Sequence, residues 1–287
     1  MEVAFPFNES ASEKCNCFCS QGITMFKQEN KYPKLGALAL IFLSGYGQVA
    51  SASDFMLSPF ALYEQGKKDI YIDNIRTKYG LGVLGVAVET KVGKYFNIRS
   101  RLGYGYHPNA DVSLTVQSRQ VAVSGPVEGT YLEGAASYVL WSKLDYSVGA
   151  EVRFVSRDVK ASDLVGTAGS RPITGTAVNK FDTLDLVLSS QFPVGRRALV
   201  EISAGMSRWN LKTTATAYAQ TGGSGSLSCP CSYTKKIDTT SIDPVGGISV
   251  SSRNPRHNFD LELYSRSLKS KAGTQIIGVE MEYKFNF

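Results

Sequence analysis

The feature that most constrains the fold of this chain is an alternation of apolar and polar residues with a period of two. It is clearest in the segment IIGVEMEYKFNF (276–287), where one parity carries apolar and aromatic side chains and the other carries mostly charged or amide ones. Such a period predicts a β-strand with one apolar and one polar face. A single segment of this kind also fits a half-buried strand of a soluble sheet, so the arrangement of the segments decides between the two.

The alternating segments occur in pairs joined by short turns, and long polar stretches separate the pairs. Each segment is roughly 10 to 13 residues long, the length that a tilted strand needs to cross a bilayer. Transmembrane β-barrels have this order of short periplasmic turns and longer external loops. The short turns lie at 91–94, 142–143, 193–197 and 253–257, and the long stretches, rich in Ser, Thr, Gly and Asp, lie at 107–128, 157–180 and 210–242.

The strand count can also be predicted from the segments. Nine of them follow from residue 78 onward, and bacterial single-chain barrels have even counts, so one more strand must precede them. The segment DFMLSPFALYEQ (54–65) is the candidate, although Pro59 weakens it because proline donates no ladder hydrogen bond. The sequence therefore predicts an all-β fold, a transmembrane antiparallel up-and-down β-barrel of about ten strands, with eight as the alternative.

Parity sends the charged residues of these segments to the inside of the predicted barrel. In hydrocarbon every backbone polar group must pair within the protein, so only helices and closed barrels span a membrane. A lipid-facing Arg or Lys at the midplane costs roughly 2–4 kcal/mol, and inward parity avoids this cost. The predicted lumen charges are the acids Glu89, Glu133, Glu151, Asp185, Glu201, Asp260, Glu262, Glu280 and Glu282 and the bases Arg99, Arg101, Arg153, Arg266 and Lys284.

From about residue 54 to its end, the chain resembles Gram-negative outer-membrane β-barrel proteins of the small porin and opacity type. The closing segment GVEMEYKFNF carries much of this resemblance. The resemblance implies a location in the bacterial outer membrane and two partners, the lipid of that membrane and the barrel-assembly machinery. Val279 and Met281 are expected to face the lipid. In this family the machinery reads the terminal aromatic residues, so the resemblance assigns the assembly signal to Tyr283, Phe285 and Phe287.

The N-terminal region is laid out like a secretory signal. Three lysines precede the apolar run 35–43, and small residues follow up to an A-x-A cleavage site ending at residue 52. A short membrane anchor or a buried helix is the alternative, but the apolar run is too short to span a bilayer. We therefore expect a signal peptide at 25–52 and the outer-membrane barrel domain at 53–287.

Residues 1–24 precede Met25, after which an ordinary positively charged signal start follows. Our hypothesis is that translation starts at Met25, so that 1–24 is an extension that the natural protein lacks. The cysteines of CNCFC in that extension do not match the usual spacing of a metal site. We assign no function to Cys229 and Cys231, for which a strained disulfide, a free thiol pair and an adventitious metal site stay open.

A filled lumen is favoured, because a small barrel is just wide enough for side chains to fill it. The charges are then expected to pair and hold the barrel shut, while long extracellular loops serve a structural role or contact a ligand at the surface. The alternative is a narrow, porin-like pore that prefers cations, since nine acids face five bases. We expect little or no ion conduction, and we expect 210–242 to be the longest extracellular loop and mobile.

Other function classes find less support in the sequence. The net charge of +6 comes from well-mixed charges, so no nucleic-acid partner is expected. Outer-membrane proteases and lipid-modifying hydrolases resemble this architecture and are the enzymatic alternative. Of the two histidines, His257 falls in a predicted periplasmic turn, and His107, near Asp111, is expected to be a solvated rim residue. We therefore expect no enzyme activity, no cofactor and no metal.

Overall fold

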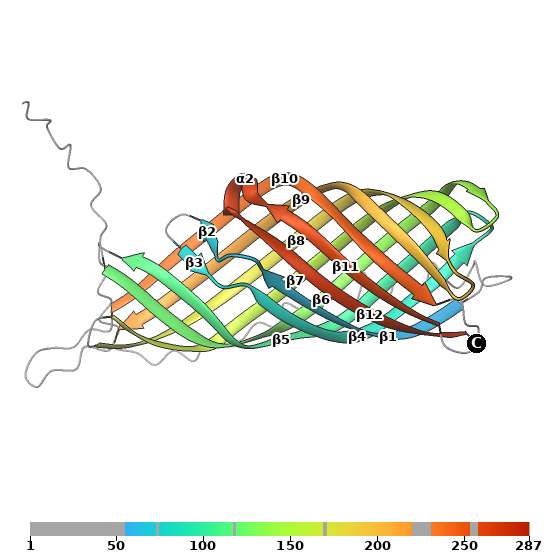
Figure 1. Ribbon diagram of the computed structural model, residues 1–287. Coiled ribbons are helices and arrows are strands. Elements are labelled where there is room, and N and C mark those ends of the chain that lie inside the picture. Colours follow the sequence, from blue (N-terminus) through green and yellow to red (C-terminus); the bar gives the residue numbers. More distant parts are fainter. Residues whose placement is uncertain are drawn as a thin grey trace, which may run out of the picture.

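Twelve strands form one sheet, of which two, β2 and β3, form a side hairpin and the other ten close into a ring (Figure 1). The computed structural model describes residues 55–72, 75–116, 119–168, 171–219, 231–252 and 258–286. The expected extension 1–24 and signal peptide 25–52 lie outside these residues. The ring consists of β1 (Phe55–Gly66), β4 (Gly80–Val92), β5 (Phe96–Val116), β6 (Arg119–Lys143), β7 (Tyr146–Ala168), β8 (Arg171–Val194), β9 (Ala198–Ala219), β10 (Cys231–Ser252), β11 (Asn258–Leu268) and β12 (Thr274–Asn286).

The predicted antiparallel up-and-down barrel is confirmed, with ten strands in the ring rather than eight. Each ring strand pairs antiparallel with the next ring strand along the chain, and β1 pairs with β12 to close the ring, for example at Ala61–Met281. The proline of β1 has a local effect: the described β1–β12 register has no pair at Ser58 or Pro59, whereas the β1–β4 register runs through Pro59–Val86. The described residues contain no helix long and apolar enough to cross a membrane.

Three of the predicted short turns lie together at one end of the barrel, which we call the turn end. The turn predicted at 142–143 lies two residues further along, at 144–145, because β6 continues to Lys143. Each of the three observed turns reverses through a residue with positive φ, namely Gly93 (68°), Leu144 (56°) and Gly195 (66°). Glycine adopts this conformation without steric cost, while Leu144 is the exception, with 91% of its surface exposed. The fourth predicted turn, 253–257, lies outside the described residues.

The prediction of three long extracellular loops is wrong. The stretches 107–128, 157–180 and 210–242 are mostly the paired ends of β5 to β10, which run from 21 to 25 residues each. We call this opposite end of the barrel the hairpin end. Of 210–242, only 220–230 lies beyond the strands, and those residues are outside the described part. Threonine is β-branched and fits a pleated strand, so a Thr-rich composition did not indicate a loop here.

The two ends of the barrel have opposite polarity. On the turn-end side of β8, Leu184 and Leu186 face outward and are 47% and 61% exposed, while Asp185 between them is buried inside. On the hairpin-end side the sense is reversed, because Ala177 faces inward and is buried while Lys180 lies exposed on the outer face. The period of two therefore continues along the whole strand, but the apolar face changes from the outside to the inside.

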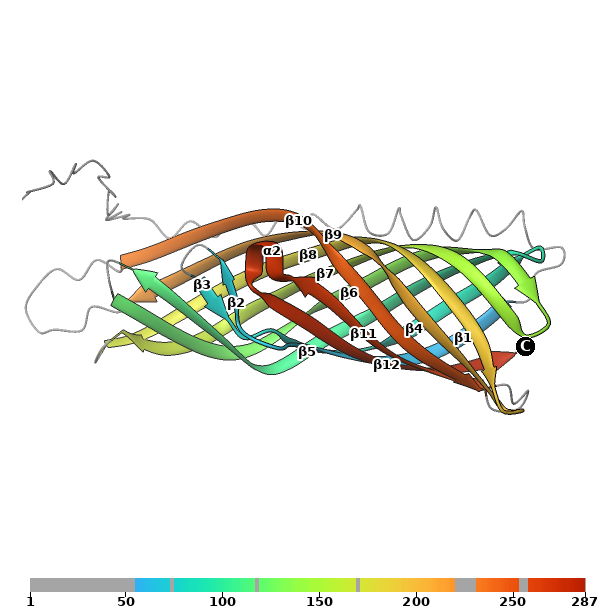
Figure 2. The same cartoon turned by 45° about the horizontal axis from the view of Figure 1, so that its top comes forward.

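The wall of the barrel is lower on one side than on the other. β1, β4, β11 and β12 end well before β5 to β10, and two small elements stand above their ends (Figures 1 and 2). The hairpin of β2 (Ile70–Ile72) and β3 (Ile75–Thr77) pairs with β5, and helix α2 (Lys269–Ala272) packs against β10 and β2. In the described register β2 pairs with β3 alone, and β10 before Val245 pairs with β9 alone, so the ladder is interrupted between β2 and β10.

Candidate functional site

Inside the turn end of the barrel, one lysine lies between two carboxylates. The ammonium group of Lys284 on β12 is 3.1 Å from Glu89 on β4 and 2.6 Å from Asp260 on β11. The amide of Asn97 donates a further hydrogen bond to Glu89 (2.8 Å). One cation thus links strands on both sides of the β1–β12 seam.

The centre of the lumen is organised around Arg101 on β5. Its guanidinium contacts the carboxylates of Glu133 (3.2 Å), Glu282 (2.5 Å) and Glu280, and only 2% of its side chain is exposed. It also lies over the ring of Phe60, 5.4 Å from the ring centroid. A buried charge is costly unless it is paired and hydrogen-bonded, and here three carboxylates from two sides of the barrel surround one cation.

A second set of charges continues this network across the lumen. Arg153 on β7 lies 2.7 Å from Glu151 and 3.4 Å from Glu262 on β11. All of these groups come from the turn-end half of the barrel, where the outer surface is apolar. The remaining ion pairs are Arg99–Glu133 (3.1 Å) and Arg99–Glu151 (3.9 Å), and Glu201 on β9 is half-buried.

Towards the hairpin end, the network ends in a pair that we call the clasp, Glu64 on β1 and Arg157 on β7. The Arg157 Nε donates to Glu64 Oε2 at 2.7 Å, and Arg157 Nη2 donates to Oε1. The hydroxyl of Tyr79 donates to the same carboxylate at 2.6 Å, as does the hydroxyl of Tyr264. Glu64 has no exposed surface, so four donors satisfy a carboxylate that water does not reach.

Aromatic rings enclose the cation of the clasp. The Arg157 guanidinium lies between the rings of Tyr131 and Phe181, 5.5 and 5.3 Å from their centroids. Phe181 in turn contacts Tyr79 and Trp209, with 6.4 Å between ring centroids in both pairs. These side chains come from strands on several sides of the ring, so together they form a layer across the lumen.

Two further buried contacts lie beside the clasp. Arg266 on β11 pairs with Asp185 on β8 and donates to the Ser207 hydroxyl at 3.2 Å. The indole of Trp209, which is fully buried, donates to Asp243 at 2.8 Å. Asp243 also accepts from Ser270 of α2, so this small helix is tied to the interior of the barrel.

The structure places the predicted lumen charges on the inner face, in the contacts described above. Glu280 and Glu282 are 4% and 1% exposed, while Met281 between them faces outward and is 57% exposed. Sequence reasoning missed Glu64 and Arg157. Glu64 lies in FMLSPFALYEQG, where both faces are largely apolar and parity gives no direction, and Arg157 begins the stretch that was interpreted as a loop.

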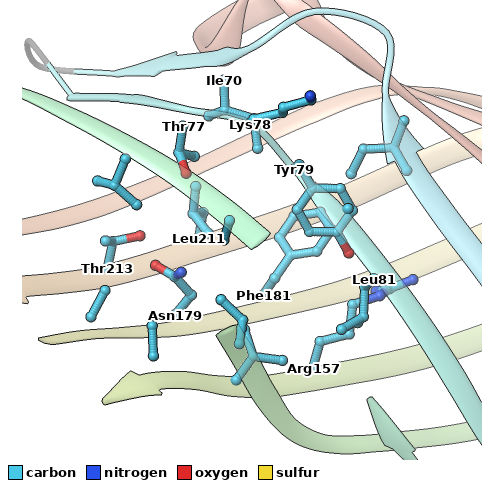
Figure 3. A pocket seen from close by; sticks show the side chains of 18 of the residues that line it. Ile70, Thr77, Lys78, Tyr79, Leu81, Arg157, Asn179, Phe181, Leu211 and Thr213 are labelled. Carbon is cyan, nitrogen blue, oxygen red and sulfur yellow. The ribbon is translucent and has the colours of Figure 1, made fainter. Parts of the chain in front are cut away.

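An internal cavity, which we call the chamber, lies on the hairpin-end side of the clasp (Figure 3). Its volume is about 60 Å³, and a smaller cavity of about 20 Å³ shares part of its lining. Tyr79, Phe181 and Arg157 of the clasp layer form one side. The rest is mainly aliphatic, and its apolar lining includes Leu81, Val112, Val159, Leu211 and Ile276, all of them buried.

His107, for which the sequence predicts a solvated rim position, is half-buried. The His107 imidazole accepts a hydrogen bond from the backbone N–H of Asn109 (3.3 Å), and the backbone carbonyl of Asp111 accepts from Lys78 and Thr77. In the described residues, no cluster of three or more His, Cys, Asp or Glu side chains could hold a metal ion. His257 and Cys229 lie outside the described residues.

The closing strand presents aromatic residues near its end. The rings of Tyr283 and Phe285 are edge to face, with centroids 4.9 Å apart, and Phe285 is 46% exposed on the outer surface. Phe287, the third residue of the expected assembly signal, lies outside the described residues.

The strand pairing described above shows that the fold is a closed, antiparallel up-and-down β-barrel. No protein-family description and no curated protein sequence matches the chain. Similar solved structures are the translocator domain of the autotransporter NalP from Neisseria meningitidis (9% identity, TM-score 0.49, covering 88% of this chain and 96% of that one), the outer membrane protease OmpT from Escherichia coli (9%, 0.44, 82% and 96%) and the outer membrane protein OprG from Pseudomonas aeruginosa (12%, 0.39, 82% and 97%).

Proposed function

We propose that this protein is an outer-membrane barrel that does not conduct ions and whose hairpin end serves as a rigid surface for interactions outside the cell. The observation that carries the proposal is the layer formed by the clasp and its aromatic neighbours, in which Glu64 and Arg157 are almost completely buried. An open pore would leave such charges in water. Paired and stacked across the lumen, they close it.

The membrane location is supported by the outer surface of the barrel. The outward residues of β5 include Phe96, Leu102 and Tyr106, which are 36%, 58% and 50% exposed. Ten residues of tilted strand rise roughly 23–25 Å, which is the height of the apolar band of outer-membrane barrels. Trp141 and Tyr146 are exposed near the turn end, and Tyr106 is exposed at the opposite limit of the apolar band. Girdles of aromatic residues mark both membrane interfaces of such barrels.

The hairpin end then projects from the membrane as paired strand. On β8, the residues from Asp182 back to Arg171 lie beyond the apolar band, a distance of roughly 25–30 Å along the barrel axis. Its outward side chains include Lys160, Lys180 and Lys212, all exposed. The sequence predicts that extracellular loops contact a ligand at the surface. The outer wall of the hairpin end, although it is built of paired strands, supports the same role.

A narrow cation-preferring pore is the second candidate, and the charge count is the observation that favours it. Adding Glu64 and Arg157 to the predicted set gives ten acids and six bases, so the acid excess of four remains. Acidic side chains along a water path attract cations. This pore requires a continuous path of water past the clasp.

Conductance of the refolded, full-length protein in planar bilayers separates these two functions. The wild type is expected to show little or no current. A Glu64→Ala/Arg157→Ala double variant removes the clasp without leaving one charge unpaired, and it is expected to conduct more. A Lys212→Ala/Asp238→Ala variant, which removes an exposed pair on the outer face, is the matched control. A large, steady wild-type current that prefers cations would establish the pore instead.

A further inference from the structure

The chamber contrasts with the rest of the lumen, which is filled by long charged and aromatic side chains. Protein interiors are normally packed to the density of organic crystals, and an apolar cavity costs free energy in proportion to its volume. Here the space follows from the sequence, because small inward residues line it: Ala110, Ala161 and Ala177. The same strands place Arg101, Arg157 and Asp185 inward on the turn-end side.

From these features we propose that the chamber is a binding site for a small apolar molecule of about three or four non-hydrogen atoms that carries at most one hydrogen-bonding group. An apolar cavity of about 150 Å³ binds benzene, which is about 25 Å³ for each non-hydrogen atom of that ligand. The chamber of about 60 Å³ and the adjoining cavity of about 20 Å³ therefore hold about three such atoms together. A short alkane or a short aliphatic alcohol has these dimensions.

The lining selects an apolar, uncharged ligand. Leu81, Leu211 and Ile276 present aliphatic carbon, and the Phe181 ring offers an aromatic surface. Arg157 also lines the chamber, but Glu64 neutralises its charge. Lys78 lies at the border and is solvent-exposed. An ionic ligand would therefore lose its hydration without gaining a free counter-charge.

Polar groups gather on one side of the chamber. Asn179 on β8 and Thr213 on β9 lie close together there, with Thr77 of β3 nearby (Figure 3). The Thr77 hydroxyl donates to the backbone carbonyl of Asp111 (3.2 Å). The amide of Asn179 can donate to or accept from a ligand hydroxyl, which is why one hydrogen-bonding group on the ligand is accommodated.

Access to the chamber does not require passage through the clasp. The smaller cavity is lined by Ile70 and Ile72 of β2 and by Ile237 of β10, the two strands between which the wall is interrupted. A small molecule that enters between β2 and β10 reaches the chamber from the hairpin end. The site is therefore independent of whether the lumen below conducts ions.

Fluorine NMR of fluoroethane and 2-fluoroethanol tests the proposal on the refolded, full-length protein in detergent micelles. Both probes are expected to show a saturable bound signal that is distinct from the micellar one. Ala177→Leu fills the chamber and is expected to weaken binding of both probes about tenfold or more. Val178→Leu, the matched control on the outward face of the same strand, is expected to leave both affinities unchanged. Asn179→Leu is expected to weaken 2-fluoroethanol about three- to tenfold and to spare fluoroethane.

The outcomes separate a binding site from unspecific partition. If the wild type and Ala177→Leu give the same non-saturable signal, the probes enter only the micelle and the proposal is overturned. If Ala177→Leu fails to fold, Val159→Phe fills the same space from β7 and the same result is expected of it. Equal weakening by Val178→Leu would place binding on the outer wall and also overturn the proposal.

Discussion

At the scale of single residues, the clasp concentrates an unusual amount of buried charge. Glu64 and Arg157 are 0% and 2% exposed, and each would be left as an isolated buried ion if the other were removed. Two tyrosines and two aromatic faces complete their surroundings. Removing both residues together should therefore affect the fold less than removing one of them, because the single change leaves a buried charge without its partner.

We expect Glu64→Gln and Arg157→Met to destabilise the barrel by about 3–5 kcal/mol each, because breaking a buried ion pair leaves one buried charge without its partner. The double variant is expected to lose much less than the sum. Urea unfolding in lipid vesicles, followed by Trp fluorescence, gives the three free energies. Lys212→Ala, at an exposed pair, is the control and should leave the unfolding midpoint unchanged. Additive losses would show that the two residues act separately.

His107 lies beyond the apolar band, where burial and the positive charge of Lys78 lower its pKa below the ordinary 6.5, opposed by Asp111. Since the folded pKa is lowered, the neutral imidazole is favoured in the fold. The stability from His107 is present above 6.5 and is lost as the pH falls through the folded pKa. In a His257→Gln variant, NMR should give a midpoint below 6.5 for the remaining imidazole. Lys78→Met should raise this midpoint and Asp111→Asn should lower it; no response to Lys78→Met would contradict the assignment.

At the scale of elements, the strands of the hairpin end explain which parts of the fold could be predicted. The period of two in the turn-end half predicts nine of the ten ring strands, because apolar outward residues and charged inward residues alternate there. The tenth, β1, is predicted from the even strand count instead, since both faces of its segment are largely apolar. The period did not predict strand length, because beyond the band the apolar face turns inward and the residues become small. The chamber could not be predicted either, since Ala177 and Leu211 come together only through pairing of β8 and β9.

The β9–β10 hairpin allows a direct test of whether 210–242 forms paired strands or a mobile loop. Lys212 and Lys236 are paired in the register Lys212–Asp238 and Lys236–Thr214, and cleavage requires local opening of such backbone. We expect trypsin on intact cells to spare both lysines, as read by mass spectrometry of the released peptides. Rapid cutting after either lysine, before global unfolding, would restore the interpretation of 210–242 as a mobile loop. Heat-unfolded protein, which should be cut at both, is the control.

At the scale of the whole molecule, the same strands have two different outer surfaces along their length. In the apolar band the charges lie inside and carbon lies outside; beyond it, carbon lies inside and charge lies outside. The lower part therefore has the apolar surface of a protein surrounded by lipid or detergent, and the upper part has the polarity of a soluble protein. The boundary between the two coincides with the layer formed by the clasp and its aromatic neighbours.

This boundary predicts how single cysteines react along one face of β8 in a background without native cysteines. Leu186→Cys, in the band, should react with a lipid-phase label and resist a water-soluble maleimide. Val178→Cys points to the same face but lies beyond the band, so the water-soluble label should be favoured there. On β12, Val279→Cys should take the lipid-phase label and Glu280→Cys should not. If the cysteine at 178 prefers the lipid-phase label, the membrane extends further towards the hairpin end than proposed. If the cysteine at 280 prefers it, the inward and outward faces of β12 are the reverse of those described.

Because the hairpin end is built of paired strands, it also determines which kind of antibody can bind this protein. Side chains that are neighbours on the outer wall, such as Lys212 and Asp238, come from different strands and are far apart in the sequence. An antibody that binds this wall therefore recognises a conformational epitope assembled across hairpins. Such antibodies should lose their target on denatured protein and on linear peptides, so a useful immunogen has to be the folded barrel.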